Sequence, residues 1–559
     1  MKLFKYGLPF AALAVLASCS NDNLDAPQDG GSKFVPGETT YMNLTISLPE
    51  FAGTKADGLQ DYDKSYDTEY NLNDGWIYLF AAGGDDNGKC LAKGYIDVKG
   101  LANHDKPDIT GTLNFYGIPI DSEFDSSNKP SAGWTPQDNV NYNALIILNQ
   151  GLNNEGITPP AIDQTYDNWV NSVKESTTMP MMFTPSGGST TYFTMTNALG
   201  WAGDATLTPA VPNALVSVDG SYLYQGTNND PSKVVTFYVQ RVVSKVSLGT
   251  GGITVGGEAK VVKGWEEQGY PKVKLTAWDL NKKNSKTFPV QQIDGAFIDN
   301  YITNWTSLAT KRTRFLGNNA DGFRRIYWAV DPNYSDYADE FSQLSDLSNT
   351  SLDPKYCFEN TFDLANMEKN QSTSIVFKAE YNVSSTGATT APSFLAFGPN
   401  FYELSSVNDL KSTKNQSSCT GTLDDLMDDG EKIKAAKAAL KCSDDDIVTF
   451  YLNGVCYYNV IIRHFADSEL DAGFYADWAF TGKYFNNTTP GPDDLDHYLG
   501  RYGMVRNNWY EIVINTISGP GETDIPEPGD DPDDDPNPYK LDLTINILNW
   551  AKRVHGYDL

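Results

Sequence analysis

Cys19 is the residue whose surroundings most clearly predict a covalent reaction. It ends the run Leu16-Ala17-Ser18-Cys19, which resembles a bacterial lipobox, and a basic start and the apolar residues 8–17 precede it. That apolar stretch is too short for a permanent membrane span. In a lipobox the cysteine thiol receives a diacylglycerol and becomes the first residue after cleavage. Residues 1–19 are therefore predicted to be a lipoprotein signal peptide with its lipobox, and Cys19 a lipid anchor.

The peptide bond between Lys55 and Ala56 is a second candidate for chemistry. Residues 49–58 contain proline, glycine and other small residues, which predicts an exposed loop that proteases can enter. Lys55 is the only basic residue between Lys33 and Lys64. A trypsin-like protease acting there would release everything before the cut. The alternative reading is an ordinary surface lysine.

Other chemistry is weakly represented. The sequence lacks H-E-x-x-H, G-x-S-x-G and G-x-x-x-x-G-K-[ST], and its four histidines are scattered. Prolines interrupt the aspartate-rich residues 530–537 where a calcium loop must bend. We therefore predict no catalytic residue, metal or cofactor. Pairs of acidic residues leave glycoside hydrolysis open, and an aromatic content of 12% leaves sugar binding open.

Two similar stretches predict strands near the two ends of the chain. Residues 43–48 read N-L-T-I-S-L and residues 542–547 read D-L-T-I-N-I. Polar and apolar residues alternate, so each stretch has one apolar face. The first face consists of Met42, Leu44, Ile46 and Leu48, and the second of Leu541, Leu543, Ile545 and Ile547. Each strand needs a groove for this face, so either could fill the same one. Chance likeness between alternating strands is the alternative.

Polar segments adjoin both strands. Residues 20–37 are rich in Asn, Asp, Gly and Pro, which predicts a disordered spacer before the first strand. Residues 521–538 are acidic and proline-rich, which predicts a stiff extended linker before the last one. The C-terminal strand could thus reach beyond its own domain.

Composition sets further bounds. A chain of 559 residues is long enough for two domains plus tails, and its net charge of −30 disfavours nucleic acid and anionic lipid as partners. Apart from Cys19, five cysteines at irregular spacings indicate neither a disulfide framework nor a zinc site. We expect most of them to be small buried hydrophobic residues.

The body of the chain reads as mainly β. Residues 233–248 are too long for one flat strand, so a bend is expected there between domains. Hairpins are predicted around residues 76–95 and around the Asn453-Gly454 turn. Val273, Leu275 and Ala277 are expected on one face of the strand 272–280. Helices are predicted at 163–172, 342–347 and 431–441.

The two ends of the chain resemble the fimbrillin family of Bacteroidales type V pili, most closely the shaft pilin of the short, or minor, fimbriae. The likeness is carried by the lipobox, the first strand followed by a basic site, the run 505–512 (V-R-N-N-W-Y-E-I), and the ending 545–559. The family's usual basic residue at the cut is arginine, whereas this chain has Lys55.

The resemblance implies an all-β fold of two tandem transthyretin-like β-sandwich domains, with a few short helices and a C-terminal donor strand that includes Trp550. On this reading the parts of the chain are a propeptide with the first strand (20–55), an N-terminal domain (56–238), a C-terminal domain (239–520), the linker (521–538) and the donor strand (539–559).

The implied function is a structural subunit of a surface fimbria and not an enzyme. The implied partners are copies of the chain itself, accessory tip and anchor pilins and the maturation protease, with membrane contact only through the precursor's lipid at the outer membrane. A lipid-anchored glycan-binding protein and a tip or anchor pilin are the alternatives.

Overall fold

The fold is described from a computed structural model of the chain. It describes residues 33–47, 72–98, 112–137, 139–151, 157–174, 182–183, 191–201, 214–293, 324–325, 329–333, 341–342, 347, 350–361, 371–397, 400–404, 448–462, 503–525 and 541–549. The described parts consist mainly of strands, as predicted. Among them no helix is both long and apolar enough to cross a membrane.

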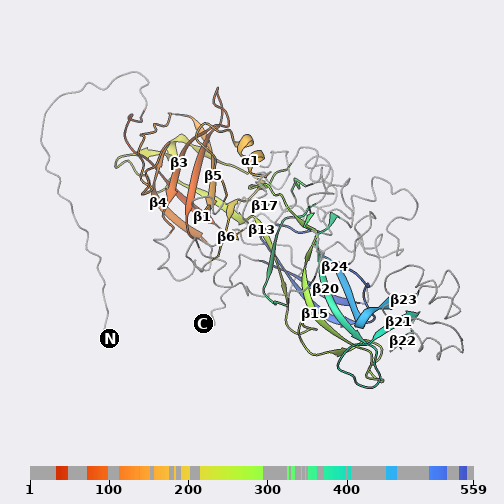
Figure 1. Cartoon of the computed structure of the whole chain (residues 1–559). Helices are drawn as coiled ribbons and strands as arrows, with labels where there is room; N and C mark the ends of the chain where they lie inside the picture. The colour runs from red at the N-terminus through yellow and green to blue at the C-terminus, as the bar shows by residue number, and fades with distance from the viewer. Residues whose placement is uncertain are drawn as a thin grey trace, which may run out of the picture.

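A nine-stranded sheet forms the N-terminal half of the fold (Figure 1). Its strands are β1 (Thr40–Ser47), β2 (Gly75–Ala81), β3 (Cys90–Ile96), β4 (Thr112–Asp121), β5 (Asn141–Leu148), β8 (Met195–Asn197), β10 (Val216–Asp219), β11 (Tyr224–Gln225) and β12 (Val234–Arg241). The order is β10-β5-β2-β3-β4-β1-β12-β8, and β8 also pairs with β5, so the sheet closes on itself.

This sheet folds into two layers because two of its junctions are narrow. β3 and β4 share only two residue pairs, as do β5 and β8. Gly94 lies at the first junction, where an added Cβ would come within 2.5 Å of Ile120 Cδ1 and 2.7 Å of Pro119 O. Apolar residues of β2 and β3 pack against those of β1 and β12 in one buried cluster. The core therefore lies between the layers, as in a β-sandwich.

The long β-branched run is divided between two sheets, as the sequence predicts. β12 ends at Arg241 and β13 (Val243–Leu248) begins a second system after Val242. One of its sheets has the order β19-β13-β25-β26, and the other has the order β14-β15-β20-β24. The strands are β14 (Lys260–Val261), β15 (Lys272–Asn281), β19 (Lys355–Phe358), β20 (Ser374–Asn382), β24 (Val455–Ile461), β25 (Asn508–Ile517) and β26 (Leu541–Asn549).

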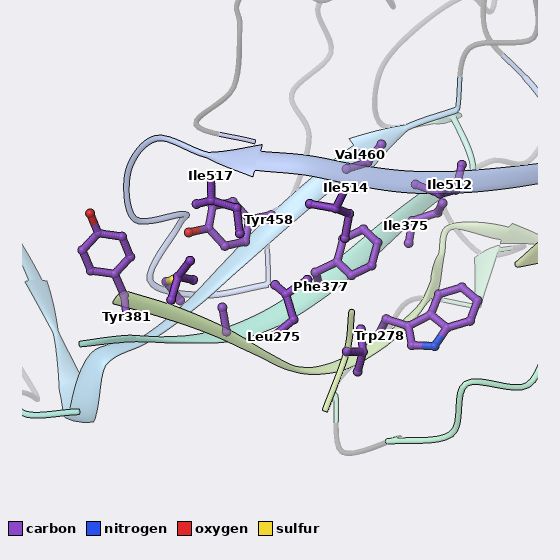
Figure 2. Packing of buried hydrophobic residues seen from close by; sticks show 14 of the residues in the cluster. Leu275, Trp278, Ile375, Phe377, Tyr381, Tyr458, Val460, Ile512, Ile514 and Ile517 are labelled. Carbon is purple, nitrogen blue, oxygen red and sulfur yellow. The ribbon is translucent and has the colours of Figure 1, made fainter. Parts of the chain in front are cut away.

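A second apolar core lies between these two sheets. Figure 2 shows Ile512, Ile514 and Ile517 of β25 facing the residues of β15, β20 and β24. Among the latter, Leu275 and Phe377 are fully buried. This packing fixes the position of β25. Along its edges, β25 pairs with β13 on one side and with β26 on the other.

A buried ion pair holds the segment that leads into β25. Arg506, just before β25, pairs with Glu359, and both side chains have no exposed area. Arg506 also donates to Thr287 Oγ1 over 3.1 Å and to Phe288 O over 2.8 Å. Breaking a buried pair of this kind typically costs about 3–5 kcal/mol. The described residues just before β25 are therefore firmly placed.

The remaining described elements are short. They are α1 (Tyr166–Lys174), β6 (Met182–Phe183) with β7 (Tyr192–Phe193), β9 (Gly200–Trp201) with β17 (Arg324–Arg325), β16 (Lys283–Asn284) with β18 (Phe341–Ser342), and β21 (Ser393–Phe397) with β22 (Asn400–Leu404) and β23 (Val448–Tyr451). α1 overlaps the predicted helix 163–172. The predicted helix 342–347 is wrong at both described ends, since Ser342 lies in β18 and Leu347 has no helical assignment. The predicted helix 431–441 lies outside the described residues.

The two predicted hairpins have different outcomes. β2 and β3 pair antiparallel, which confirms the hairpin at 76–95. The Asn453-Gly454 turn also forms, with φ of 49° and 67° at the two residues. The hairpin prediction is nevertheless wrong there, because β23 pairs with β21 whereas β24 pairs with β20. The turn passes the chain from one sheet to another.

The predicted alternation along β15 fails at one residue. The pairing of β15 with β20 shifts between Leu275 and Ala277, which marks a β-bulge. Val273 and Leu275 face the second core, but Ala277 packs on the opposite side with Val376. A bulge inserts one residue and so reverses the faces beyond it.

The described cysteines agree with the prediction that most of the five cysteines other than Cys19 are small buried residues. Cys90, Cys357 and Cys456 are free thiols and buried. Burial raises the pKa of Cys90 and of Cys357 to about 12, so these thiols stay protonated. Cys19, Cys419 and Cys442 lie outside the described residues.

Candidate functional site

The first predicted strand, β1, is bonded along both of its edges. It pairs antiparallel with β4 from Thr40 to Ser47 and parallel with β12 from Asn43 to Ser47. β11 pairs with its first two residues. We call the space that β1 occupies between β4, β11 and β12 the β1 slot. Without β1, the backbone groups on both sides of this slot would lack their partners.

The apolar face of β1 is a central part of the first core. Met42 and Leu44 have no exposed area and Ile46 has 1%. All three belong to the cluster between the two layers, which confirms the predicted face. Burying three such side chains contributes about 1.5–3 kcal/mol each. Leu48, the fourth predicted member, lies outside the described residues.

Asn43 adds a polar contact that sequence reasoning missed. Its side chain is on the other face of β1 and is 1% exposed. Its Oδ1 accepts from the Gly117 N–H over 3.0 Å and from the Tyr224 hydroxyl over 3.3 Å. Its Nδ2 donates to Asn229 Oδ1 over 2.8 Å and to Asp230 O over 3.4 Å. These partners come from distant parts of the sequence, so no local pattern reveals them.

The contact with Gly117 depends on a bulge in β4. The register between β1 and β4 shifts between Met42 and Leu44, so Tyr116 and Gly117 together lie opposite Asn43. Gly117 has a φ of +67°, a conformation that glycine adopts without the penalty of a Cβ. The bulge turns its N–H toward the Asn43 side chain.

The segment before β1 also packs against the sheet, which corrects part of the predicted disordered spacer. Phe34 is 4% exposed and belongs to the first core. Gln225 Oε1 accepts from the Val35 N–H over 2.7 Å, and its Nε2 donates to the carbonyls of Val35 and Glu38. Residues 33–37 are therefore ordered because an aromatic ring and a buried amide hold them.

The C-terminal strand β26 lies on a sheet of its own chain. It pairs antiparallel with β25 from Leu541 to Asn549, and within the part of the chain that the structure describes it is the last strand of its sheet. In this register Leu541, Leu543, Ile545 and Ile547 are opposite Ile517, Ile514, Ile512 and Tyr510. Asp542 is exposed, and the Thr516 hydroxyl donates to its Oδ2 over 3.4 Å. β1 and β26 are thus in separate sheets, and Trp550 lies outside the described residues.

The start of the predicted linker is not a free tether. Glu522 and Tyr457 exchange two backbone hydrogen bonds of 2.7 and 2.8 Å. The Tyr451 hydroxyl donates to Gly521 O over 2.8 Å. Residues 521–525 are consequently anchored next to β24, and any extended linker begins after them. Residues 526–540 lie outside the described residues.

The candidate cleavage site lies outside the described residues as well. Lys55 and Ala56 fall between Ser47, where β1 ends, and Leu72, where the description resumes. The connection from β1 to the rest of the fold therefore contains the predicted cut.

Comparison with known proteins gives one family match. Residues 475–555 match the model described as the C-terminal region of fimbrillin, the major fimbrial subunit protein type IV. No match to a curated protein was found. The matched range includes both β25 and β26.

Solved structures share the chain's length but little of its sequence. A candidate cell adhesion protein from Parabacteroides distasonis is 12% identical, with 93% of this chain and 99% of that one covered and a TM-score of 0.38. A fimbrilin from Porphyromonas gingivalis is 14% identical, with 92% and 98% covered and a TM-score of 0.38. These scores are too low for the likeness to add to the family match. Residues 475–555 are therefore similar to the C-terminal region of fimbrillins, which supports there the family resemblance that the sequence indicated.

Proposed function

We propose that this chain is a structural shaft subunit of a surface fimbria, and that subunits polymerise by strand exchange. In this scheme a protease removes the first strand, and the C-terminal strand of the next subunit fills the β1 slot. The observation that carries the proposal is the placement of β1, which is bonded on both edges and buries Met42, Leu44 and Ile46 in the core. Removal of such a strand leaves an incomplete sandwich.

The C-terminal strand has the pattern that the β1 slot requires. With Asp542 aligned to Asn43, Leu543 and Ile545 take the places of Leu44 and Ile46. Thr544 then takes the place of Thr45. The same alternation supplies an apolar face to the core and backbone groups to both neighbouring strands.

The two positions of this strand differ in what they offer. In its own chain it has one neighbouring strand, β25, among the residues that are described, whereas the β1 slot offers β4 on one side and β12 on the other. While β1 remains in place the slot is occupied, so the uncut chain stays monomeric. The C-terminal strand and the β1 slot are in different parts of each subunit, so the contact between subunits is head-to-tail. Head-to-tail contacts that do not close into a ring make filaments.

The maturation steps follow from the two ends of the sequence. The precursor is exported, lipidated at Cys19 and held at the outer membrane until a trypsin-like protease cuts between Lys55 and Ala56. The parts are then a propeptide of residues 20–55, two domains and a terminal strand of 539–559. The domain boundary expected between residues 238 and 239 moves to Val242, because β12 runs to Arg241. Accessory tip and anchor pilins would complete the fimbria, and no step requires catalysis by this chain.

N-terminal sequencing of the surface polymer tests this scheme first. The expected mature chain begins at Ala56, and intact Cys19 in polymerised material would contradict the proposal. Deletion of residues 539–559 should abolish the filament and leave an exported, folded monomer. A lipid-anchored glycan-binding protein would instead keep Cys19, remain monomeric and lose oligosaccharide affinity when exposed Trp or Tyr residues are changed.

A further inference from the structure

The polar face of the β1 slot discriminates between its two candidate strands; this inference rests on the proposed function. The aligned strands are nearly the same on their apolar faces, but they differ where Asn43 of β1 corresponds to Asp542 of β26. Asn43 is the residue of β1 with the most side-chain hydrogen bonds to the slot. The difference therefore falls on a site where the slot makes specific demands.

Two main-chain groups fix what this site accepts. The Gly117 N–H can only donate and the Asp230 carbonyl can only accept, and each contacts the Asn43 amide, over 3.0 and 3.4 Å. An amide satisfies both because it has an acceptor on one side and a donor on the other. A carboxylate has only acceptors, so it would satisfy Gly117 and leave the Asp230 carbonyl facing another oxygen.

The surroundings make this mismatch costly. Asn43 is 1% exposed, so a carboxylate in its place would lose most of its own hydration. Hydrogen bonds from the Ser232 hydroxyl and N–H lower the pKa of Asp230, so its carboxylate stays charged close to the carbonyl that Asn43 binds. On the other side, burial and the nearby Tyr41 raise the pKa of Tyr224, whose hydroxyl remains a donor and would serve an amide oxygen and a carboxylate alike, so the discrimination falls on the Asp230 side.

On its own sheet Asp542 meets no such conflict among the described residues. It is exposed, and the Thr516 hydroxyl donates to its carboxylate. We propose that this position sets strand preference: the β1 slot favours the amide of Asn43 over the carboxylate of Asp542, so the first strand keeps the slot until it is cut. Asp542 is then a specificity-determining residue that delays exchange and weakens the finished joint.

The test compares D542N with wild type in fimbriae isolated from cells. The measured quantity is the time for half of the detergent-resistant oligomers, which form a ladder of bands on a gel, to dissociate at a fixed temperature. Wild-type fimbriae should give a ladder, and D542N should lengthen the half-time about tenfold, equivalent to about 1.4 kcal/mol. D542A is the matched control, because it removes the carboxylate without supplying a donor, and its half-time should stay well below that of D542N.

A reciprocal substitution tests the same site in the uncut chain. N43D should speed hydrogen exchange of the β1 amides about tenfold relative to wild type. If D542N fimbriae dissociate no more slowly than wild type, or if D542A fimbriae dissociate as slowly as D542N, the strand preference is disproved while strand exchange stands. If wild-type fimbriae form but N43D leaves exchange of β1 unchanged, the preference is likewise disproved. Failure of the trimmed wild-type chain to polymerise would overturn the proposed function itself.

Discussion

β1 and β26 have matching sequences but opposite positions in their sheets. β1 has a strand on each side and its described apolar residues are buried, whereas β26 has one partner among the described strands and ends its sheet there. An alternating strand alone does not determine which of these places it takes. The difference shows that the neighbours of a strand, and not its own pattern, decide whether it completes a core or lies at an edge. The proposed assembly depends on this difference.

The largest expected effect comes from a charge on the apolar face of β1. Leu44→Asp should prevent stable folding of the N-terminal sheet in the uncut chain, because an unpaired carboxylate in the core costs several kcal/mol. Leu543→Asp, the matched change in β26, should leave the N-terminal sheet of the uncut chain folded, because β26 is not part of that sheet, and should abolish the filament. Thermal unfolding by circular dichroism and electron microscopy measure the two outcomes. Equal loss of folding in both variants would remove the distinction between the strands.

A smaller effect is expected at the segment that precedes β1. Phe34→Ala should reduce the free energy of unfolding of the uncut chain by about 3 kcal/mol, since the ring is in the core. The trimmed chain lacks residue 34, so fimbriae assembled from this variant should be unaltered. Urea unfolding checks the first statement and ladder dissociation the second. Val35→Ala is the control, because that side chain is 50% exposed and a change there should be nearly neutral. An altered ladder would mean that the segment is retained.

The smallest effect is expected at the bulge in β4. Gly117→Ala forces a side chain into a left-handed conformation, which costs about 1 kcal/mol. An added Cβ would contact only the Tyr224 hydroxyl oxygen, at 3.5 Å, so the cost comes from the backbone. Because β4 stays in the molecule after the cut, both the uncut chain and the fimbria should weaken. An effect on only one of them would show that the slot changes shape when its strand is exchanged.

Local sequence patterns predicted the strands better than their partners. Alternation indicated β1, and a turn rich in Gly, Asp and Asn indicated the β2–β3 hairpin. The length of residues 233–248 indicated a bend, which the structure places at Val242. The Asn453-Gly454 dipeptide predicted its turn but not that the chain changes sheets there. A turn depends on two residues, whereas strand pairing depends on the whole core.

The missed parts of the site share a physical cause. Asn43 meets partners at positions 117, 224, 229 and 230, and Gln225 holds a segment almost 190 residues earlier. The bulge that moves Ala277 to the other face of β15 is also set by packing. Such contacts form only once the sheets have folded, so a one-dimensional pattern contains no sign of them.

Directed disulfide formation is the most direct test of where β26 goes. Thr45 Oγ1 donates to Asn114 Oδ1 over 2.6 Å, so Thr544 should come to face Asn114 if the C-terminal strand fills the β1 slot in the same register. On its own sheet Thr544 is instead opposite Val513. Each pair is replaced by cysteines, and each single cysteine variant serves as the control for the native thiols.

The account predicts that trimmed chains with Asn114→Cys and Thr544→Cys form a covalent ladder of dimers, trimers and longer polymers under oxidation. Trimmed chains with Val513→Cys and Thr544→Cys should then form no internal disulfide once polymerised. A result in which only the Val513 pair joins, within single subunits, would contradict strand exchange.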